Sequence, residues 1–164
     1  MKKLLVVMFL LALIVPLTVS AQSADNEIFG VQFGFLGGYN LNTDETVVGN
    51  DFVLKFTLSD SMQLGFRSIS FPDTVAPANP LGYSFLNFSY FMMPQVSFDV
   101  MVGSETAGAT TELAGGMEAA FILFKSADEA FSSALKVKAG YLFDATNGVE
   151  NGVVNAGLIG SIGY

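Results

Sequence analysis

The segment Val153–Tyr164, with the sequence VVNAGLIGSIGY, contains the pattern that decides the fold. Counting back in twos from Tyr164, every residue is apolar or glycine, whereas the intervening residues are mostly small or polar. Successive side chains of a β-strand point to opposite faces of the sheet. The pattern therefore predicts a strand with one apolar face and one narrower, more polar face, which ends on an outward-pointing aromatic residue.

The first 21 residues, MKKLLVVMFLLALIVPLTVSA, have the features of a secretory signal peptide. Lys2 and Lys3 form the positive region, Leu4–Val15 forms the apolar region, and small residues precede a cleavage site after Ala21. The apolar run is shorter than the about 20 residues that a spanning helix needs, and Pro16 interrupts it. We expect residues 1–21 to be removed and residues 22–164 to form one exported domain.

The composition limits the partners and the chemistry that the chain can have. It contains 7 basic and 15 acidic residues, and without Lys2 and Lys3 the net charge is 5 − 15, or −10. Such a charge repels nucleic acid, so no nucleic-acid partner is expected. The mean hydropathy of +0.52 is high for an acidic protein. Because no second long apolar run follows the signal, this apolar content must be dispersed along the chain.

After the signal, eight segments alternate between apolar and polar residues, and polar or Gly- and Pro-containing breaks separate them. The predicted strands are Ile28–Tyr39, Asp51–Ser59, Met62–Phe71, Tyr83–Met92, Gln95–Gly103, Leu113–Phe124, Ala134–Phe143 and Val153–Tyr164. The sixth has the weakest alternation, and there Phe124 is expected on the same face as Glu118. The long breaks are Asn40–Asn50, Pro72–Gly82, Ser104–Glu112 and Asp144–Gly152, and these alternate with shorter ones.

Long loops that alternate with short turns are typical of outer-membrane barrels, whose short turns are periplasmic. The sequence thus predicts an all-β fold, an eight-stranded antiparallel up-and-down transmembrane β-barrel in the bacterial outer membrane, with both termini in the periplasm. A secreted, soluble lipocalin-like barrel is the alternative, but its apolar face would point inward. The bulky Phe and Leu side chains of the apolar face cannot all fit inside eight strands.

These features together resemble the small outer-membrane barrels of the OmpA/OmpX type. The resemblance covers the whole chain after the signal and concerns architecture rather than activity. It implies outer-membrane lipid as the surroundings, a monomer, and recognition of the last strand by the barrel-assembly machinery. The positions that match this assembly signal are Leu158, Ile162 and Tyr164, and Gly160 replaces a bulkier residue.

The chain contains no histidine and no cysteine. Outer-membrane lipid-modifying enzymes and proteases with this kind of barrel use a catalytic histidine, so we expect no enzyme activity. The same absences argue against zinc and transition-metal sites, and no cofactor is expected. The acidic external loops offer oxygen ligands for divalent cations but have no ordered ligand spacing. Whether they bind such cations stays open.

The polar faces of the predicted strands carry charges that should point into the barrel lumen. These residues are Lys55, Arg67, Asp99, Glu118, Lys136 and Lys138. Charges in a narrow lumen must pair or be hydrated, and we expect an Arg67–Glu118 or a Lys138–Asp99 contact. Tyr39, Tyr83 and Tyr164 fall at strand ends, where interfacial aromatic side chains are expected.

These observations favour an integral barrel with a structural or surface-interaction role and a lumen plugged by polar and charged side chains. The Gly-lined interior and acidic mouth leave a second possibility, a narrow pore for water or small cations. The soluble ligand-binding barrel remains a third.

Overall fold

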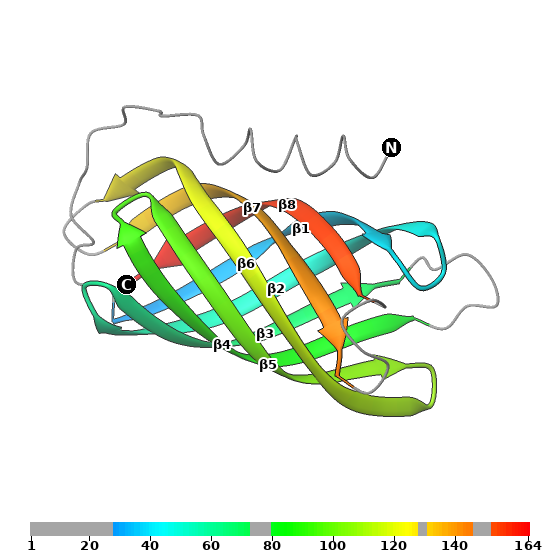
Figure 1. Ribbon diagram of the computed structural model, residues 1–164. Coiled ribbons are helices and arrows are strands. Elements are labelled where there is room, and N and C mark those ends of the chain that lie inside the picture. Colours follow the sequence, from blue (N-terminus) through cyan, green and yellow to red (C-terminus); the bar gives the residue numbers. More distant parts are fainter. Residues whose placement is uncertain (1–27, 73–79, 128–130, 146–151) are drawn as a thin grey trace.

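The computed structural model describes residues 28–72, 80–127, 131–145 and 152–164, and the predicted signal peptide lies outside these residues. The described chain forms eight β-strands and no helix (Figure 1). The strands are β1 (Phe29–Asn40), β2 (Glu45–Ser59), β3 (Met62–Phe71), β4 (Leu81–Met93), β5 (Val96–Ala107), β6 (Thr110–Ala127), β7 (Ser132–Asp144) and β8 (Val153–Gly163).

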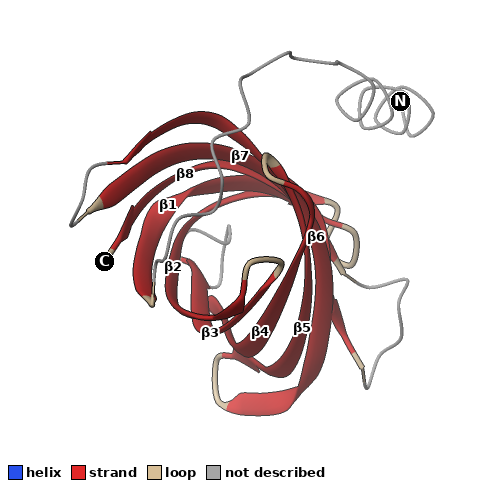
Figure 2. Ribbon diagram, turned by 90° about the vertical axis from the view of Figure 1, so that its left-hand side faces the viewer, coloured by secondary structure: helices blue, strands red, loops and turns tan. Residues whose placement is uncertain are grey.

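Each strand pairs antiparallel with its neighbours in sequence, and β1 pairs with β8 to close the barrel (Figure 2). The β1–β8 register runs from Gly30 opposite Gly163 to Asn40 opposite Val153. We call the end of the barrel that holds Phe29 and Gly163 the terminal end, and the opposite end the far end. The predicted fold class, an eight-stranded antiparallel up-and-down barrel, is confirmed.

The two faces of the sheet are divided as the alternation predicts. Large apolar side chains lie exposed on the outside, among them Phe35 (63% exposed), Phe66 (59%) and Ile162 (64%). The polar set points inward, and Lys138 and Glu118 are at most 2% exposed. A soluble lipocalin-like barrel requires the reverse distribution, with an outer surface that is mainly polar. In the described part of the chain, no helix has the length and apolar character needed to cross a membrane.

Two of the expected long breaks are short turns. Strand β2 begins at Glu45, so only residues 41–44 connect it to β1, and β5 and β6 continue to residues 107 and 110. The sequence prediction was wrong here because backbone pairing continues where the regular alternation of apolar and polar side chains ends. Ladder hydrogen bonds join backbone groups and do not require an apolar face. Asp44 and Gly108 turn the chain with positive φ angles of 61° and 60°, which Asp and Gly tolerate better than most residues.

Three register shifts lie near the short turns at the terminal end, between Thr57 and Ser59, Phe91 and Met93, and Ile122 and Phe124. A bulge inserts an extra residue and changes the face on which the following side chains lie. Phe124 is therefore 61% exposed, and the prediction that it shares the inner face of Glu118 was wrong.

The barrel interior as candidate functional site

Six charged side chains from five strands meet at mid-height in the lumen. We call them the central charge layer: Asp51, Lys55, Arg67, Asp99, Glu118 and Lys138. Three are acidic and three are basic, and none is more than 4% exposed. Because an isolated buried charge is costly, this equal number of opposite charges is the arrangement that a narrow lumen requires.

Arg67 of β3 is the central member of this layer. Its Nε and Nη2 atoms donate to the two carboxylate oxygens of Asp51, each at 2.8 Å. Nη2 also donates to Oε2 of Glu118 at 2.7 Å, so the Arg67–Glu118 contact expected from the sequence is present. Such two-point contacts with a carboxylate use the planar shape of the guanidinium group and fix its orientation.

The lysines complete the layer on either side of Arg67. The Nζ atom of Lys138 lies 3.0 Å from Oε1 of Glu118 and 3.4 Å from Oδ2 of Asp51. Lys55 donates to Oγ of Ser89 at 2.8 Å and lies 3.7 Å from Asp99. Lys138 thus bridges the two carboxylates that Arg67 contacts, whereas Asp99 pairs with Lys55.

The register explains how Glu118 reaches this position. It lies directly opposite Asp99 on β5 and Gly140 on β7. A Cβ atom at position 140 would lie 2.6 Å from the carbonyl oxygen of Met117 and 2.9 Å from Cβ of Glu118. Gly140 therefore allows β6 and β7 to approach each other where Glu118 projects inward. The two opposed carboxylates would repel each other, and Lys138, Arg67 and Lys55 offset that repulsion.

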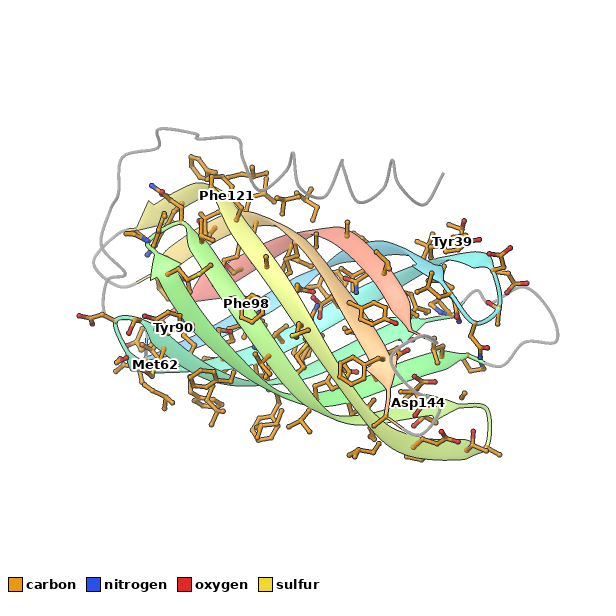
Figure 3. All side chains as sticks on the ribbon, viewed as in Figure 1. Tyr39, Met62, Tyr90, Phe98, Phe121 and Asp144 are labelled. Atoms are coloured by element: carbon orange, nitrogen blue, oxygen red, sulfur yellow. The ribbon has the colours of Figure 1, made fainter. Side chains whose placement is uncertain are left out.

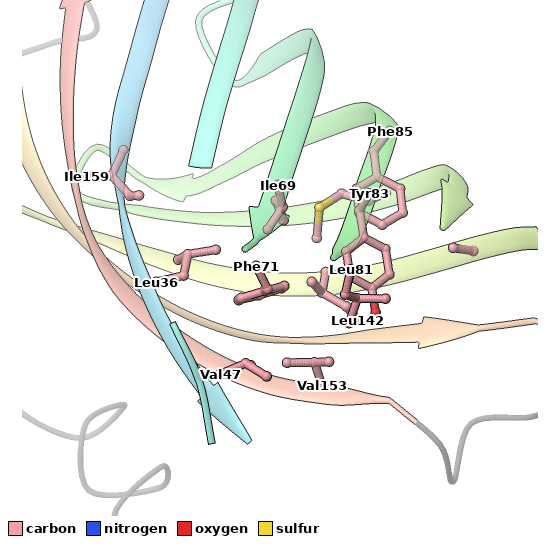
Figure 4. Packing of buried hydrophobic residues seen from close by; sticks show 12 residues of the cluster. Leu36, Val47, Ile69, Phe71, Leu81, Tyr83, Phe85, Leu142, Val153 and Ile159 are labelled. Carbon is pink, nitrogen blue, oxygen red and sulfur yellow. The ribbon is translucent and has the colours of Figure 1, made fainter. Parts of the chain in front are cut away.

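An apolar cluster fills the lumen on the far side of the central charge layer (Figure 4). Its largest side chains include Phe71, Leu142, Tyr83 and Phe85, all at most 3% exposed. The rings of Tyr83 and Phe85 stack with their centroids 5.5 Å apart. The prediction of Tyr83 as an interfacial aromatic was wrong, because it has the same parity on β4 as Phe85 and points into the lumen.

The other predicted residues lie on the outside or near the barrel ends. Tyr39 lies at the far end, as does Asp144, whereas Met62 and Tyr90 lie toward the terminal end (Figure 3). The Tyr39 hydroxyl donates to Asp44 of the following turn. Tyr164 is 67% exposed at the terminal end, and its ring centroid lies 5.5 Å from that of Phe131.

The remaining predicted site residues are Lys136 on β7 and Leu158 and Ile162 on β8. Lys136 is buried on the inner face of β7, but it lies closer to the terminal end than the central charge layer. Leu158 and Ile162 are 48% and 64% exposed on the outside of β8. They thus lie on the outer face of β8, whereas Val153 and Ile159 of the same strand point into the lumen.

Sequence reasoning missed Asp51 as a member of the site. Its side chain is fully buried and contacts both Arg67 and Lys138. The sequence does indicate that Asp51 points inward, because it lies four residues before Lys55 on the same strand and therefore shares its face. The sequence prediction begins the strand at Asp51, directly after the break Asn40–Asn50, and assigns this residue no role in the lumen. No group of three His, Cys, Asp or Glu side chains that could hold a metal ion occurs within the described ranges.

No family model and no curated protein matches this chain. Among solved structures, Neisserial surface protein A is similar with a TM-score of 0.54 and 10% identity, over 82% of this chain and 94% of the other. A de novo designed transmembrane β-barrel is similar with a TM-score of 0.51 and 15% identity, over 85% and 99%. The N-terminal β-barrel domain of Pseudomonas aeruginosa OprF has a TM-score of 0.48 and 15% identity, over 82% and 97%.

At these identities the similarity concerns the fold alone. The closed barrel, its apolar exterior and its charged interior define the class of the protein as an eight-stranded transmembrane β-barrel. A neisserial surface protein and a designed transmembrane β-barrel are among the solved structures that share this fold.

Proposed function

We propose that this chain is a closed, non-conducting outer-membrane barrel of the OmpA/OmpX type, with a structural or surface-interaction role. The observation that carries the proposal is the succession of two filled layers in the lumen. The central charge layer occupies mid-height, and the apolar cluster follows it toward the far end.

The two layers oppose ion flow for different physical reasons. An ion that passes mid-height must displace one charged side chain of the central charge layer from its partner. The displaced contact leaves a buried charge unpaired, which is costly. Beyond that layer it must pass Phe71, Leu142 and Val153, none of which is more than 1% exposed. These side chains offer no polar group to replace the water around the ion. The alternative, a narrow pore for water or small cations, needs a continuous polar path instead.

The exposed apolar outer surface supports placement in lipid. The two connections that remain long, residues 72–80 and 145–152, join strands at the far end, which supports an orientation with the far end outside the cell. In this proposal outer-membrane lipid covers the exposed apolar side chains, and the protein is a monomer exported by a signal peptide at residues 1–21. In this orientation both termini are periplasmic, and the terminal end of the barrel, where β1 begins and β8 ends, faces the periplasm. The barrel-assembly machinery recognises Leu158, Ile162 and Tyr164 during biogenesis. A non-catalytic role agrees with the absence of histidine and cysteine.

Single-channel recording in planar lipid bilayers tests the closed lumen. The protein should produce no reproducible conductance steps, while a porin added to the same membranes shows that channels are detectable. Insertion must be verified independently, by flotation with lipid vesicles and by a heat-dependent shift in mobility on a detergent gel. Reproducible steps from the correctly inserted protein would favour the pore and overturn the proposal.

A further inference from the structure

The methionines of the described chain are distributed unevenly over the barrel. Met62 begins β3, and Met92 and Met93 end β4, so these three lie on adjacent strands at the terminal end (Figure 3). We call them the methionine group. The described chain has two other methionines: Met101 is 3% exposed and points into the lumen, and Met117 is 49% exposed on the outside of β6. Most of the thioether sulfur atoms of the described barrel thus belong to one rim.

The strand register places Met62 and Met92 side by side on the outer face. Met62 lies directly opposite Tyr90, and Met92 is two residues further along β4, so it shares the face of Tyr90. The backbone N–H of Phe91 donates to the carbonyl oxygen of Ser61 at 2.8 Å, so the contact between the two strands continues beyond Met62. Diagonal neighbours of this kind are about 7–8 Å apart, a distance that long side chains can span.

A β-bulge adds Met93 to the same exposed rim. Phe91 pairs with Ser97 and Met93 pairs with Val96, which makes Met92 the extra residue of β4. In a regular strand, two consecutive side chains would point to opposite faces, and one of the two methionines would be buried in the lumen. Bulges change the direction of side chains, and here Met92 and Met93 are both exposed, at 57% and 62%. The bulge therefore completes a group of three exposed thioethers.

The chemistry of these side chains differs from that of other apolar residues because thioether sulfur is a soft ligand that favours Cu(I). The chain has no cysteine and no histidine, which argues against zinc and against most transition-metal sites. That argument does not extend to a soft monovalent ion bound by methionine alone. The position also gives access to water, since the turn at residues 94–95 directly follows Met93.

We propose that the methionine group binds one soft monovalent metal ion of the Cu(I) type through its three thioether sulfur atoms. The methionine side chain is unbranched and has three rotatable bonds, so the side chains need only rotate to bring their sulfur atoms to one ion. A surface that merely faces lipid requires apolar side chains here, and leucine would serve equally well. The site does not depend on which side of the membrane the terminal end faces.

The test is titration of the full folded barrel, in detergent and in a chloride-free buffer, with silver nitrate. Ag(I) is the probe because it is a soft monovalent ion like Cu(I) and is stable in air. The barrel carries ¹³C-labelled methionine methyl groups, and NMR follows each of them. We expect the signals of Met62, Met92 and Met93 to shift together and to saturate at about one equivalent of Ag(I). The signals of Met101 and Met117 should not move.

Met117 is the matched control because it is an exposed methionine on the same outer surface but lies outside the group. The triple variant M62L/M92L/M93L keeps the apolar volume but removes the sulfur atoms. It should bind Ag(I) more weakly by roughly tenfold or more, whereas M117L should bind as the unmodified barrel does. A heat-dependent gel shift confirms that each variant is folded.

Cu(I), added under anaerobic conditions with ascorbate, should shift the same three methyl signals as Ag(I). The proposal is overturned if neither ion shifts them, if the signal of Met117 responds as strongly as those of the methionine group, or if M62L/M92L/M93L keeps the affinity of the unmodified barrel.

Discussion

Arg67 and Asp51 form a two-point ion pair in the middle of the lumen, with both N–O distances at 2.8 Å and both side chains fully buried. The pair joins adjacent strands at positions that are not directly opposite each other, since Arg67 pairs with Val53 in the ladder. A diagonal contact of this kind lets Arg67 reach both Asp51 and Glu118, and it makes the guanidinium group the link between β2 and β6.

Replacement of Asp51 by Asn should destabilise the barrel by about 3–5 kcal/mol, because it leaves one excess positive charge buried. The amide of Asn offers one neutral acceptor oxygen in place of two charged ones, so Arg67 would lose its two-point contact and Lys138 would lose one of its two charged partners. The measurement is the free energy of unfolding by guanidinium in lipid vesicles. The control is D44N at the exposed turn, where Asn also tolerates the positive φ angle, and it should leave the stability unchanged. Equal stability of D51N and the unmodified barrel would contradict a role for the charge layer in stability.

A second charge removal should compensate for part of the first. In D51N/K138Q the layer keeps two acidic and two basic groups, so no excess charge remains buried. We expect the double variant to be more stable than the sum of the single changes predicts, by about 0.5–3 kcal/mol. The four unfolding free energies of the double-mutant cycle give this coupling directly. Strict additivity would show that Asp51 and Lys138 do not interact in the folded barrel.

Gly140 should be far less tolerant of a side chain than Gly37. An alanine Cβ at position 140 meets backbone atoms of Met117 and Glu118 at 2.6–3.0 Å, whereas nothing lies within 4 Å of one at position 37. Overpacking of this kind costs about 1–3 kcal/mol. Unfolding of G140A should therefore occur at lower denaturant concentration, and G37A serves as the matched control. Similar midpoints for the two variants would contradict the close approach of β6 and β7.

An arginine on the outer face should distinguish a lipid-facing surface from a water-facing one. Val100 is 46% exposed on the outside of β5 at mid-height, between Phe88 and Met117 in the ladder. V100R should cost about 2–4 kcal/mol in a bilayer, and T106R near the far end about 0–1 kcal/mol. Unfolding in lipid vesicles measures both. If the two variants lose the same small amount of stability, lipid does not surround Val100.

Much of the fold could be predicted from the sequence because lipid and a narrow lumen impose opposite demands on alternate residues. The inward positions of Lys55, Arg67 and Glu118 follow from parity alone, and so does the apolar face of β8. The lengths of the strands could not be predicted in the same way. At Glu45–Asn50 the ladder continues, but the adjacent valines Val47 and Val48 interrupt the alternation that identifies a strand in the sequence.

The details of the interior depend on information that alternation does not contain. The bulge before Phe124 inserts one residue, and that stretch contains no Gly or Pro that would indicate a bulge in the sequence. The position of Tyr83 at a strand end predicts an interfacial aromatic, whereas its parity with Phe85 places it in the apolar cluster. Parity also identifies Asp51 as an inward residue, but its choice of Arg67 as partner depends on the diagonal offset between β2 and β3.

The pairing of β1 with β8 implies a particular order of events as the chain folds. Seven of the eight strand pairs join consecutive strands, so each can form as a local hairpin. The eighth pairs Gly30 with Gly163, which are separated by almost the whole described chain. Contacts of such large sequence separation form slowly because the intervening chain must be ordered first. Until that final step, both β1 and β8 present unpaired edges that can join to another chain. The interval before closure is thus the stage at which the protein is most exposed to aggregation and most dependent on assistance.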